Sequence, residues 1–374
     1  MVEVTGIGRF DVSKEFSDLC LTDSAQNILL KKYKFAHTKK GFNKMLNKVY
    51  SIKDKFNKQD IFCGLEPTGK YHKPLASFLL KKDLALCLIS TVVSSDNRRS
   101  LDGSWRKNDS KDAFNITDLM SRNRFLFYPS PDIFYDGLRD LINHRYKLSK
   151  LLRGTKTMIK NSFFSEFFPE IEKIYSNILH PEILHILNEF PTAYHIREIS
   201  LKKFIRNFYK NKKITNRAIQ RLQTVWQIAQ DSIGCEPNIS ISVLAKSIVN
   251  QVEFYQRSIS SIEQEIERIC KGHIDYKLLL TLPGFGPVHA ASFMACVKNV
   301  NNYKNVRQVA KLAGFDLEYR ESGKYKGYMR ISKKGKALLR YTLCHAAKIS
   351  LRNKVFKDIF LEKLKIKGVC RDNK

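Results

Sequence analysis

The first 35 residues decide the fold, and residues 3–35 read EVTGIGRFDVSKEFSDLCLTDSAQNILLKKYKF. Short apolar runs bounded by turn-forming residues are typical of β-strands. They predict three consecutive strands at Glu3–Val12, Phe16–Thr22 and Asn27–Phe35. A short polar turn around Ser13–Glu15 joins the first two strands. The chain is therefore expected to begin as a three-stranded meander.

Helices and strands alternate after this meander. The spacing of apolar residues predicts a helix at Lys39–Tyr50, a strand at Ile61–Leu65, a helix at Tyr71–Leu80 and a strand at Leu84–Ser90. We expect a loop over the polar stretch Ser94–Lys107 and a helix over Ser110–Arg122. This order is typical of an α/β RNase H-like fold, and it predicts one such domain in residues 1–125.

The rest of the chain is helical in pattern. Apolar residues recur at steps of three and four through Ile241, Leu244, Ile248, Val252, Tyr255, Ile259, Ile262, Ile266 and Ile269. This spacing predicts a coiled-coil seam, either within the chain or between protomers. We expect a helical and coiled-coil region over residues 126–272 and a mainly α module over 273–374. In that module, Leu279–Val288 predicts a helix–hairpin–helix-like turn.

The chain carries a large positive charge. It has 66 Lys and Arg against 36 Asp and Glu, a formal net charge of +30, with 43% hydrophobic residues. A basic surface on a globular chain favours nucleic acid as the partner. The alternative is a lysine-rich proteome encoded by an AT-rich genome.

Other classes of protein are excluded or unsupported. The longest apolar run, Leu84–Ile89, is far shorter than the ~20 residues that span a bilayer. The first ten residues show no secretory signal, so we expect a cytoplasmic, nucleoid-associated protein with no membrane partner. The eight cysteines form no Cys-x-x-Cys pair, which argues against a zinc site or a disulfide framework.

Four acidic residues stand out in so basic a chain: Asp11, Glu66, Asp109 and Asp112. Asp11 and Glu66 end predicted strands, and the three-residue step from Asp109 to Asp112 places both on one helical face. Carboxylates are the ligands that Mg²⁺ (or Mn²⁺) prefers, and two such ions can hold both oxygens of a phosphodiester exchange. Taken singly, each acid has an ordinary alternative role, as a helix cap or a solvated charge.

The motifs around these acids resemble one family. Asp-Val-Ser-Lys at 11–14, Glu-Pro-Thr-Gly-Lys-Tyr at 66–71 and Asn-Asp-Ser-Lys-Asp-Ala at 108–113 are similar to the DEDD insertion-sequence transposases of the Piv/MooV, or "one-ten", family. The resemblance implies a domain like the RuvC-type Holliday-junction resolvases, with all four acids as metal ligands. The chain departs from the family at Arg9–Phe10, where Gly-Ile is usual, and at Asn108, where Thr is common.

The C-terminal module resembles the same family. It contains Pro-Gly-Phe-Gly at 283–286, Ala-Gly-Phe at 313–315, Glu-Ser-Gly at 321–323, Ser-Lys-Lys-Gly at 332–335 and Leu-Arg at 339–340. By resemblance the nucleophile is Ser322; Ser332 is the rival, although an N-cap role before Lys333 explains it. Expected nucleic-acid contacts come from two glycines and six cations: Gly284, Gly286, Arg320, Lys324, Lys326, Arg330, Lys333 and Arg340.

The resemblance implies a transposase or site-specific recombinase that acts on double-stranded DNA as a dimer or tetramer, guided by a bridge RNA. The RNA surface is expected at a cluster of lysines in the N-terminal domain: Lys31, Lys32, Lys34, Lys39, Lys40 and Lys44. Two alternatives remain open. One is a metal-only junction resolvase in which Ser322 is inert. The other is an inactive nucleic-acid-binding remnant, since the chain ends soon after the Leu-Arg motif.

Overall fold

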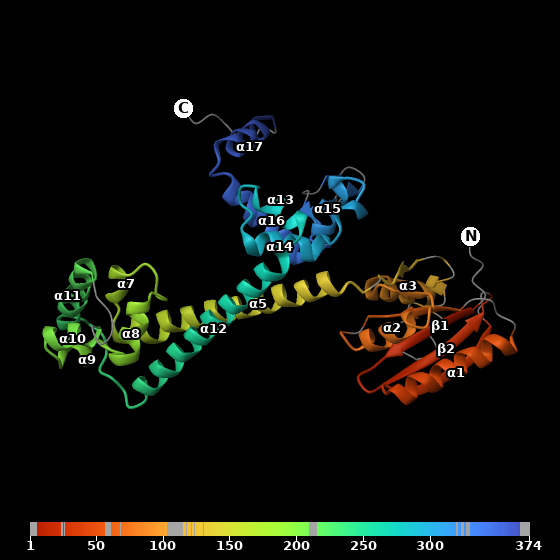
Figure 1. Ribbon diagram of the computed structural model, residues 1–374, viewed down its shortest axis with the longest axis horizontal. Helices are drawn as coiled ribbons and strands as arrows, with labels where there is room; N and C mark the ends of the chain where they lie inside the picture. The colour runs from red at the N-terminus through yellow and green to blue at the C-terminus, as the bar shows by residue number, and fades with distance from the viewer. Residues whose placement is uncertain are drawn as a thin grey trace. The chain divides into compact units, whose positions relative to one another are not determined.

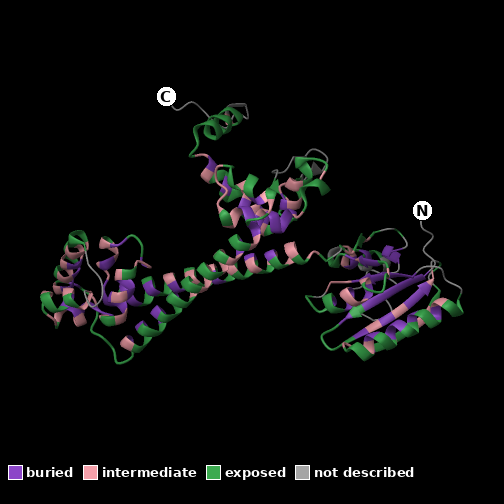
Figure 2. Ribbon diagram, viewed as in Figure 1, coloured by how far each residue is buried: buried purple, intermediate pink, exposed green. Residues whose placement is uncertain are grey.

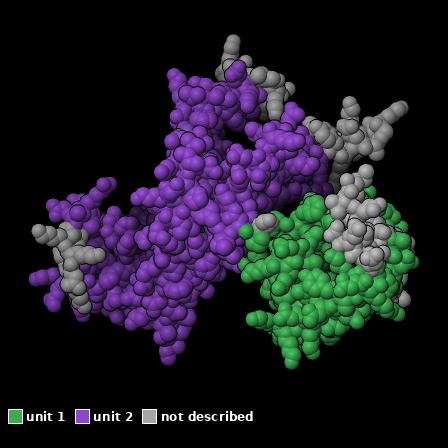
Figure 3. All heavy atoms as spheres, turned by 45° about the vertical axis from the view of Figure 1, so that its right-hand side comes forward, with its two compact units in different colours: residues 1–131 green, residues 132–374 purple. Residues whose placement is uncertain are grey.

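The computed structural model forms two compact units, residues 1–131 and 132–374 (Figure 3). The structure describes residues 6–366 apart from 24, 26, 57–60, 68, 103–114, 117, 121, 123, 130, 209–214, 319–320, 323–324 and 327–329. In this described part, no helix is both long enough and apolar enough to cross a membrane.

Unit 1 is built on one mixed sheet (Figure 1). Its strands are β1 (Gly6–Val12), β2 (Phe16–Asp23), β3 (Ile28–Ala36), β4 (Ile61–Leu65), β5 (Leu86–Leu88) and β6 (Leu126–Phe127). Their order is β3-β2-β1-β4-β5-β6, with β4 parallel to both β1 and β5 and the other pairs antiparallel. The expected meander and mixed α/β sheet are confirmed, and the order is consistent with an RNase H-like domain. The short edge strand β6 was not predicted.

Helices cover both faces of this sheet. Helices α1 (Lys39–Lys55) and α2 (His72–Leu80) bury apolar side chains against one face, where Phe10 and Leu65 lie in the core. A helical segment at residues 115–120 packs Ile116, Leu119 and Met120 against the other face. Since side chains alternate along a strand, β1, β4 and β5 contribute buried residues to both layers. The central strands β1 and β4 are accordingly almost wholly buried (Figure 2).

The prediction of a loop over Ser94–Lys107 is wrong for its described part, because α3 (Thr91–Asp102) is a helix there. The polar composition of this stretch suggested a loop. Ser94 and Asn97 are nevertheless buried, and their side chains are hydrogen-bonded. Buried polar side chains that find partners allow a helix where composition alone favours a loop.

Unit 2 is largely helical, as expected. Before the C-terminal module it contains α5 (Ile133–Ile159), a π-helical turn (Lys160–Phe164), α6 (Ser165–Phe167), α7 (Ile171–Ile174), α8 (Pro181–Glu189), α9 (Ala193–Arg197), α10 (Leu201–Phe208), α11 (Asn216–Gln230) and α12 (Ile241–Cys270). The long helices α5 and α12 run antiparallel, since Leu138 shares a cluster with Ile266 and Ile159 shares one with Ile248 (Figure 1). The predicted seam thus packs within the chain.

The C-terminal module is less purely helical than expected. Its elements are α13 (Ile274–Leu280), α14 (Pro287–Val297), a 3₁₀ turn (Val300–Asn302), α15 (Val306–Ala313), β7 (Leu317–Glu318), β8 (Glu321–Ser322), β9 (Tyr325–Lys326), β10 (Arg330–Ile331), α16 (Ala337–Ser350) and α17 (Lys354–Ile366). The antiparallel pairs β7–β10 and β8–β9 form two separate two-stranded sheets between α15 and α16 in the sequence, and we call these four strands together the ribbon. The three-part division at residues 125 and 272 stays a prediction, since the chain separates into two units.

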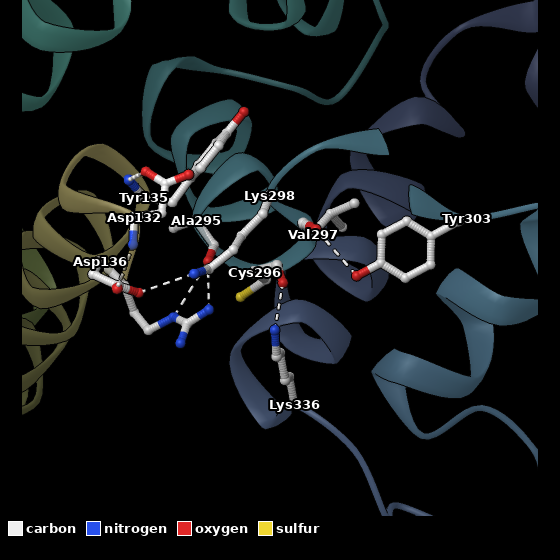
Figure 4. A network of polar contacts seen from close by, with 10 residues as sticks. Asp132, Tyr135, Asp136, Ala295, Cys296, Val297, Lys298, Tyr303 and Lys336 are labelled. Carbon is white, nitrogen blue, oxygen red and sulfur yellow. Dashed lines mark hydrogen bonds and ion pairs between the residues drawn. The ribbon is translucent and has the colours of Figure 1, made fainter. Parts of the chain in front are cut away.

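The C-terminal end of α14 is a junction of unit 2 (Figure 4). Three successive carbonyls accept hydrogen bonds from side chains: Ala295 from Arg139 (3.0 Å), Cys296 from Lys336 (2.5 Å) and Val297 from Tyr303 (3.1 Å). Cations at a helix C-terminus are favoured by the helix dipole. These bonds tie α5 and the start of α16 to α14. Burial removes water from the Lys336 ammonium group and so lowers its pKa.

Candidate functional site

Two of the predicted acids lie side by side at one edge of the sheet. Asp11 is near the carboxyl end of β1, and Glu66 directly follows β4. The parallel register pairs Phe10 with Leu65, so Asp11 and Glu66 occupy the next row. Neighbouring strands are about 4.8 Å apart. Alternation along both strands puts the two carboxylates on the face opposite the buried Phe10 and Leu65.

The electrostatic setting of this pair suits a divalent cation. Asp11 is exposed and Glu66 is half-buried. Among the residues that the structure describes, neither carboxylate forms an ion pair with lysine or arginine. Two uncompensated carboxylates at neighbouring strand ends repel each other, and a hard cation with oxygen ligands relieves that repulsion. The donors present therefore fit Mg²⁺ or Mn²⁺, although the described residues contain no set of three or more His, Cys, Asp or Glu arranged to hold a metal.

Asp109 and Asp112 lie outside the described residues. The helical segment at 115–120 that follows them packs on the face that carries Asp11 and Glu66. A Cβ added to Gly64 would lie 2.5 Å from the Met120 sulfur, so a larger residue at this position would force the flexible Met120 side chain to shift. The chain therefore returns to the acidic face three residues after Asp112.

Sequence reasoning missed an acid beside this pair. The antiparallel register of β1 and β2 places Asp18 directly opposite Asp11. Asp18 is compensated by an ion pair with Lys32 at 3.3 Å. The position of Asp18 opposite Asp11 follows from the strand register. The sequence signal for that register was the alternation of polar and apolar residues in Phe16–Thr22.

Two cysteines of the central strands lie on opposite faces of the sheet, Cys63 in the core beneath α1 and α2 and Cys87 on the face that carries Asp11 and Glu66. Burial, together with the neighbouring Cys87, raises the pKa of the Cys63 thiol to about 12, and burial raises that of Cys87 to about 11. Both thiols stay protonated near neutral pH, so neither is a nucleophile. The described cysteines are free thiols, as the sequence predicted for them.

The serine predicted as nucleophile lies near the end of the ribbon in unit 2. Ser322 on β8 pairs with Tyr325 on β9. Only two residues separate them in the sequence, Gly323 and Lys324, and both lie outside the described residues, as does Arg320. Lys326 belongs to β9.

The remaining predicted cations differ in their surroundings. Arg330 and Lys333 are exposed. The Arg340 guanidinium donates hydrogen bonds to the carbonyls of Ala313 (2.9 Å) and Lys333 (3.2 Å). Arg340 thus links the C-terminal end of α15 to the turn that follows β10. Its predicted contact with nucleic acid remains untested, but its guanidinium already has protein partners.

The rival serine has a structural role, though a different one from the role expected. Ser332 is not a helix N-cap, because α16 begins only at Ala337. Its hydroxyl accepts a hydrogen bond from the amide of Lys334 (3.3 Å) and lies 3.5 Å from the carbonyl of Gly314, to which it donates. These contacts hold the turn that leaves β10.

The two glycines of the predicted phosphate-binding turn have different environments. Gly284 has φ +91°, and an added Cβ would lie 2.2 Å from the carbonyl oxygen of Ala346 in α16. Ser350 secures this contact by donating to the carbonyl of Pro283 at 2.5 Å. Gly286, which caps α14, faces open space. Packing against α16 accounts for Gly284, whereas no atom of the described residues lies within 4 Å of a Cβ added at Gly286.

Changing Gly284 to alanine is expected to destabilise the C-terminal module by about 2–4 kcal/mol, because the substitution combines an unfavourable φ with a clash against backbone. Gly286→Ala is the matched control, with an expected cost below about 1 kcal/mol. Native-state hydrogen exchange at the amides of α16 measures both. Equal protection in the two variants would contradict the packing role of Gly284.

Comparison with protein families places two matches on the chain. A family model described as "Transposase", for the DEDD domain of IS110 elements, matches residues 9–169. A second model, described as "Transposase IS116/IS110/IS902 family", matches residues 276–360. The first match contains the acidic edge of the sheet and all of α5. The second contains the glycine turn and the ribbon with Ser322.

Curated relatives agree with these matches. The transposase for insertion sequence element IS1111A of Coxiella burnetii is 27% identical over 128 residues, 34% of this chain and 34% of the relative. An uncharacterized 44.8 kDa protein of insertion element IS116 from Streptomyces clavuligerus is 22% identical over 262 residues, 69% of this chain and 64% of the relative. A probable family 20 transposase of Pseudomonas aeruginosa is 25% identical over 109 residues, 29% and 32% of the two chains. The chain thus spans less than two thirds of the length of each.

Proposed function

The chain belongs to the IS110 family of insertion-sequence transposases, and from this premise we propose that it cleaves and rejoins double-stranded DNA. The observation that carries the proposal is the pair of carboxylates, Asp11 and Glu66, at neighbouring ends of parallel strands in a chain of net charge +30, where neither has an ion pair with Lys or Arg among the described residues. In a protein this basic, two adjacent acids without cationic partners are costly unless they bind a metal.

We assign the acidic edge to a RuvC-like metal site. Asp11 and Glu66, together with Asp109 and Asp112 by resemblance, would hold Mg²⁺ or Mn²⁺. When bound, such ions neutralise charge on the phosphodiester and activate the attacking oxygen. Asp11 contributes an exposed carboxylate that solvent and substrate reach, whereas half-buried Glu66 contributes a carboxylate held in place by the protein.

We assign the covalent step to Ser322. Its Oγ forms a bond to the phosphorus of one DNA strand while the bond between that phosphorus and a sugar oxygen breaks. The serine proton goes to a base, and the departing sugar oxygen takes up a proton. In the reverse step a sugar hydroxyl of the recombining strand attacks phosphorus and releases the serine. Exposed Arg330 and Lys333 lie on and after the strand β10 of the same ribbon, where they can stabilise charge on the phosphate.

Single substitutions at the two sites separate this proposal from its alternatives. In a plasmid recombination assay, the recombinase needs both Asp11 and Ser322. A metal-only resolvase needs Asp11 alone, and a nucleic-acid-binding remnant depends on neither. Purified protein with a synthetic four-way DNA junction provides the second substrate, because a resolvase cuts it without Ser322.

We further propose that a guide RNA binds unit 1. The sheet edge formed by β3 and the start of α1 presents six exposed lysines: Lys31, Lys32, Lys34, Lys39, Lys40 and Lys44. Such a surface binds phosphates without reading sequence, so pairing with an RNA would supply the choice of target. The alternative role of lysines on an edge strand is to prevent edge-to-edge aggregation.

Protein purified from cells that carry the whole element is expected to contain RNA from the element's flanking region. Lys31→Ala combined with Lys40→Ala is expected to lower its RNA affinity about tenfold and to flatten the salt dependence by ~0.9 per lost contact on a log–log plot. Lys81→Ala with Lys82→Ala is the matched control on another exposed turn. Random cellular RNA, with recombination resistant to RNase, would remove the support for a guide.

A further inference from the structure

Unit 1 contains a buried chain of polar side chains that ends at Glu66. Its members are Ser94 and Asn97 of α3, and Asn115 and Asp118 of the helical segment 115–120. Ser94 is 0% exposed, Asn97 7%, Asn115 1% and Asp118 4%. Burying polar groups in this number costs free energy unless each finds a partner.

Each of the four side chains is hydrogen-bonded to the next. The Asn97 amide donates to the side-chain oxygens of Asp118 (2.9 Å) and Asn115 (2.8 Å). The Asn115 amide donates to the carbonyl of Ser94 (2.8 Å) and to its hydroxyl (3.0 Å). Asp118 also forms an ion pair with Arg122 at 2.9 Å. The network joins α3 to the segment that follows the predicted ligands Asp109 and Asp112.

The end of the network contacts the acidic site. Because the Ser94 hydroxyl accepts a hydrogen bond from Asn115, its own proton is free to point to Glu66, and it donates to the carboxylate at 3.4 Å. A hydroxyl bound to a carboxylate normally lies at 2.5–2.7 Å. The longer contact orients the carboxylate and leaves it able to turn toward a cation.

Stability alone does not account for this arrangement. Ile116 and Leu119, which alternate with the network residues along segment 115–120, belong to a buried apolar cluster with Ile89. Replacing a buried polar group by an apolar group of similar volume is often neutral or stabilising. A fully satisfied network, in contrast, fixes one arrangement of the helices that carry it.

We propose that the network Ser94–Asn115–Asn97–Asp118 is a positioning device for Glu66, which sets the orientation of its carboxylate through the Ser94 hydroxyl and so the affinity of the acidic site for its divalent cation. The inference rests on the proposed metal-dependent function. Removing a group that hydrogen-bonds to a metal ligand without touching the metal commonly lowers the affinity for the metal.

Direct titration of the full-length protein with Mn²⁺, monitored by the electron paramagnetic resonance signal of the free ion, tests this proposal without reference to activity. Ser94→Ala is expected to weaken Mn²⁺ binding about 10-fold. Ser94→Cys replaces the hydroxyl by a somewhat larger thiol that donates only weakly, and its Mn²⁺ affinity is expected to lie between those of the wild type and Ser94→Ala. Ser100→Ala is the matched control, since that hydroxyl lies on the same helix and donates to the Asn97 carbonyl.

A double-mutant cycle separates positioning from general destabilisation. In a Glu66→Gln background, Ser94→Ala is expected to have no further effect on Mn²⁺ affinity. An equal loss in both backgrounds, or unchanged affinity in a folded Ser94→Ala variant, would overturn the positioning role. If Glu66→Gln itself leaves Mn²⁺ binding unchanged, the metal site and with it the proposed function fails, which is a different result.

Discussion

Replacing Asp11 by asparagine is expected to lower strand cleavage by about 10³-fold, because a metal site that loses a carboxylate ligand loses several kcal/mol of charge stabilisation on the phosphodiester. The change keeps the shape of the side chain and removes its charge. Asp11 is exposed, and it faces Asp18 across the strand pair, so loss of the charge also relieves a repulsion. The folded state is therefore expected to remain intact, with the loss confined to chemistry.

Cleavage of a labelled DNA substrate at saturating Mg²⁺, with circular dichroism of the same preparation, measures both parts of this prediction. Glu66→Gln is expected to give a loss of similar size. Asp54→Asn is the control, since this exposed carboxylate lies on α1, which covers the other face of the sheet. Full cleavage by Asp11→Asn would eliminate the metal-dependent mechanism.

Strand positions in unit 1 could be predicted because their signal is local. The strand predicted at Ile61–Leu65 is β4 with the same bounds, since five consecutive buried residues are flanked by polar ones. Asp11 and Glu66 could be placed at strand ends for the same reason. That these ends are neighbours follows from the pairing of β1 with β4, which an RNase H-like order predicts.

The features that sequence reasoning missed depend on contacts between distant residues. The buried Asn97 side chain of α3 is hydrogen-bonded to Asn115 and Asp118. Because these partners are distant in the sequence, the polar composition of the helix predicted a loop. The ribbon around Ser322 has strands of two residues each, held by backbone pairing such as Arg330 with Glu318. No apolar alternation marks strands that short. Asn115 and Asp118 did leave one signal, because they continue the three-residue spacing of Asp109 and Asp112.

Ser322→Ala is expected to abolish the covalent protein–DNA adduct and to reduce recombination to background, because it removes the oxygen that is proposed to attack phosphorus. Removing one hydroxyl deletes no cation, so DNA affinity is expected to stay within about twofold, as phosphate contacts dominate affinity. The pairing of Ser322 with Tyr325 is made by the backbone, so the substitution is expected to leave it in place. Ser332→Ala is the matched control: it removes a hydroxyl that accepts a hydrogen bond from the Lys334 amide in the adjoining turn, and it is expected to retain the adduct.

Denaturing gel electrophoresis of reactions on a nicked suicide substrate, followed by mass spectrometry of the modified peptide, measures the adduct. A modified peptide containing Ser332, or cleaved DNA with no adduct in the wild-type protein, would transfer the chemistry away from Ser322 and leave the acidic edge of unit 1 as a nuclease acting alone.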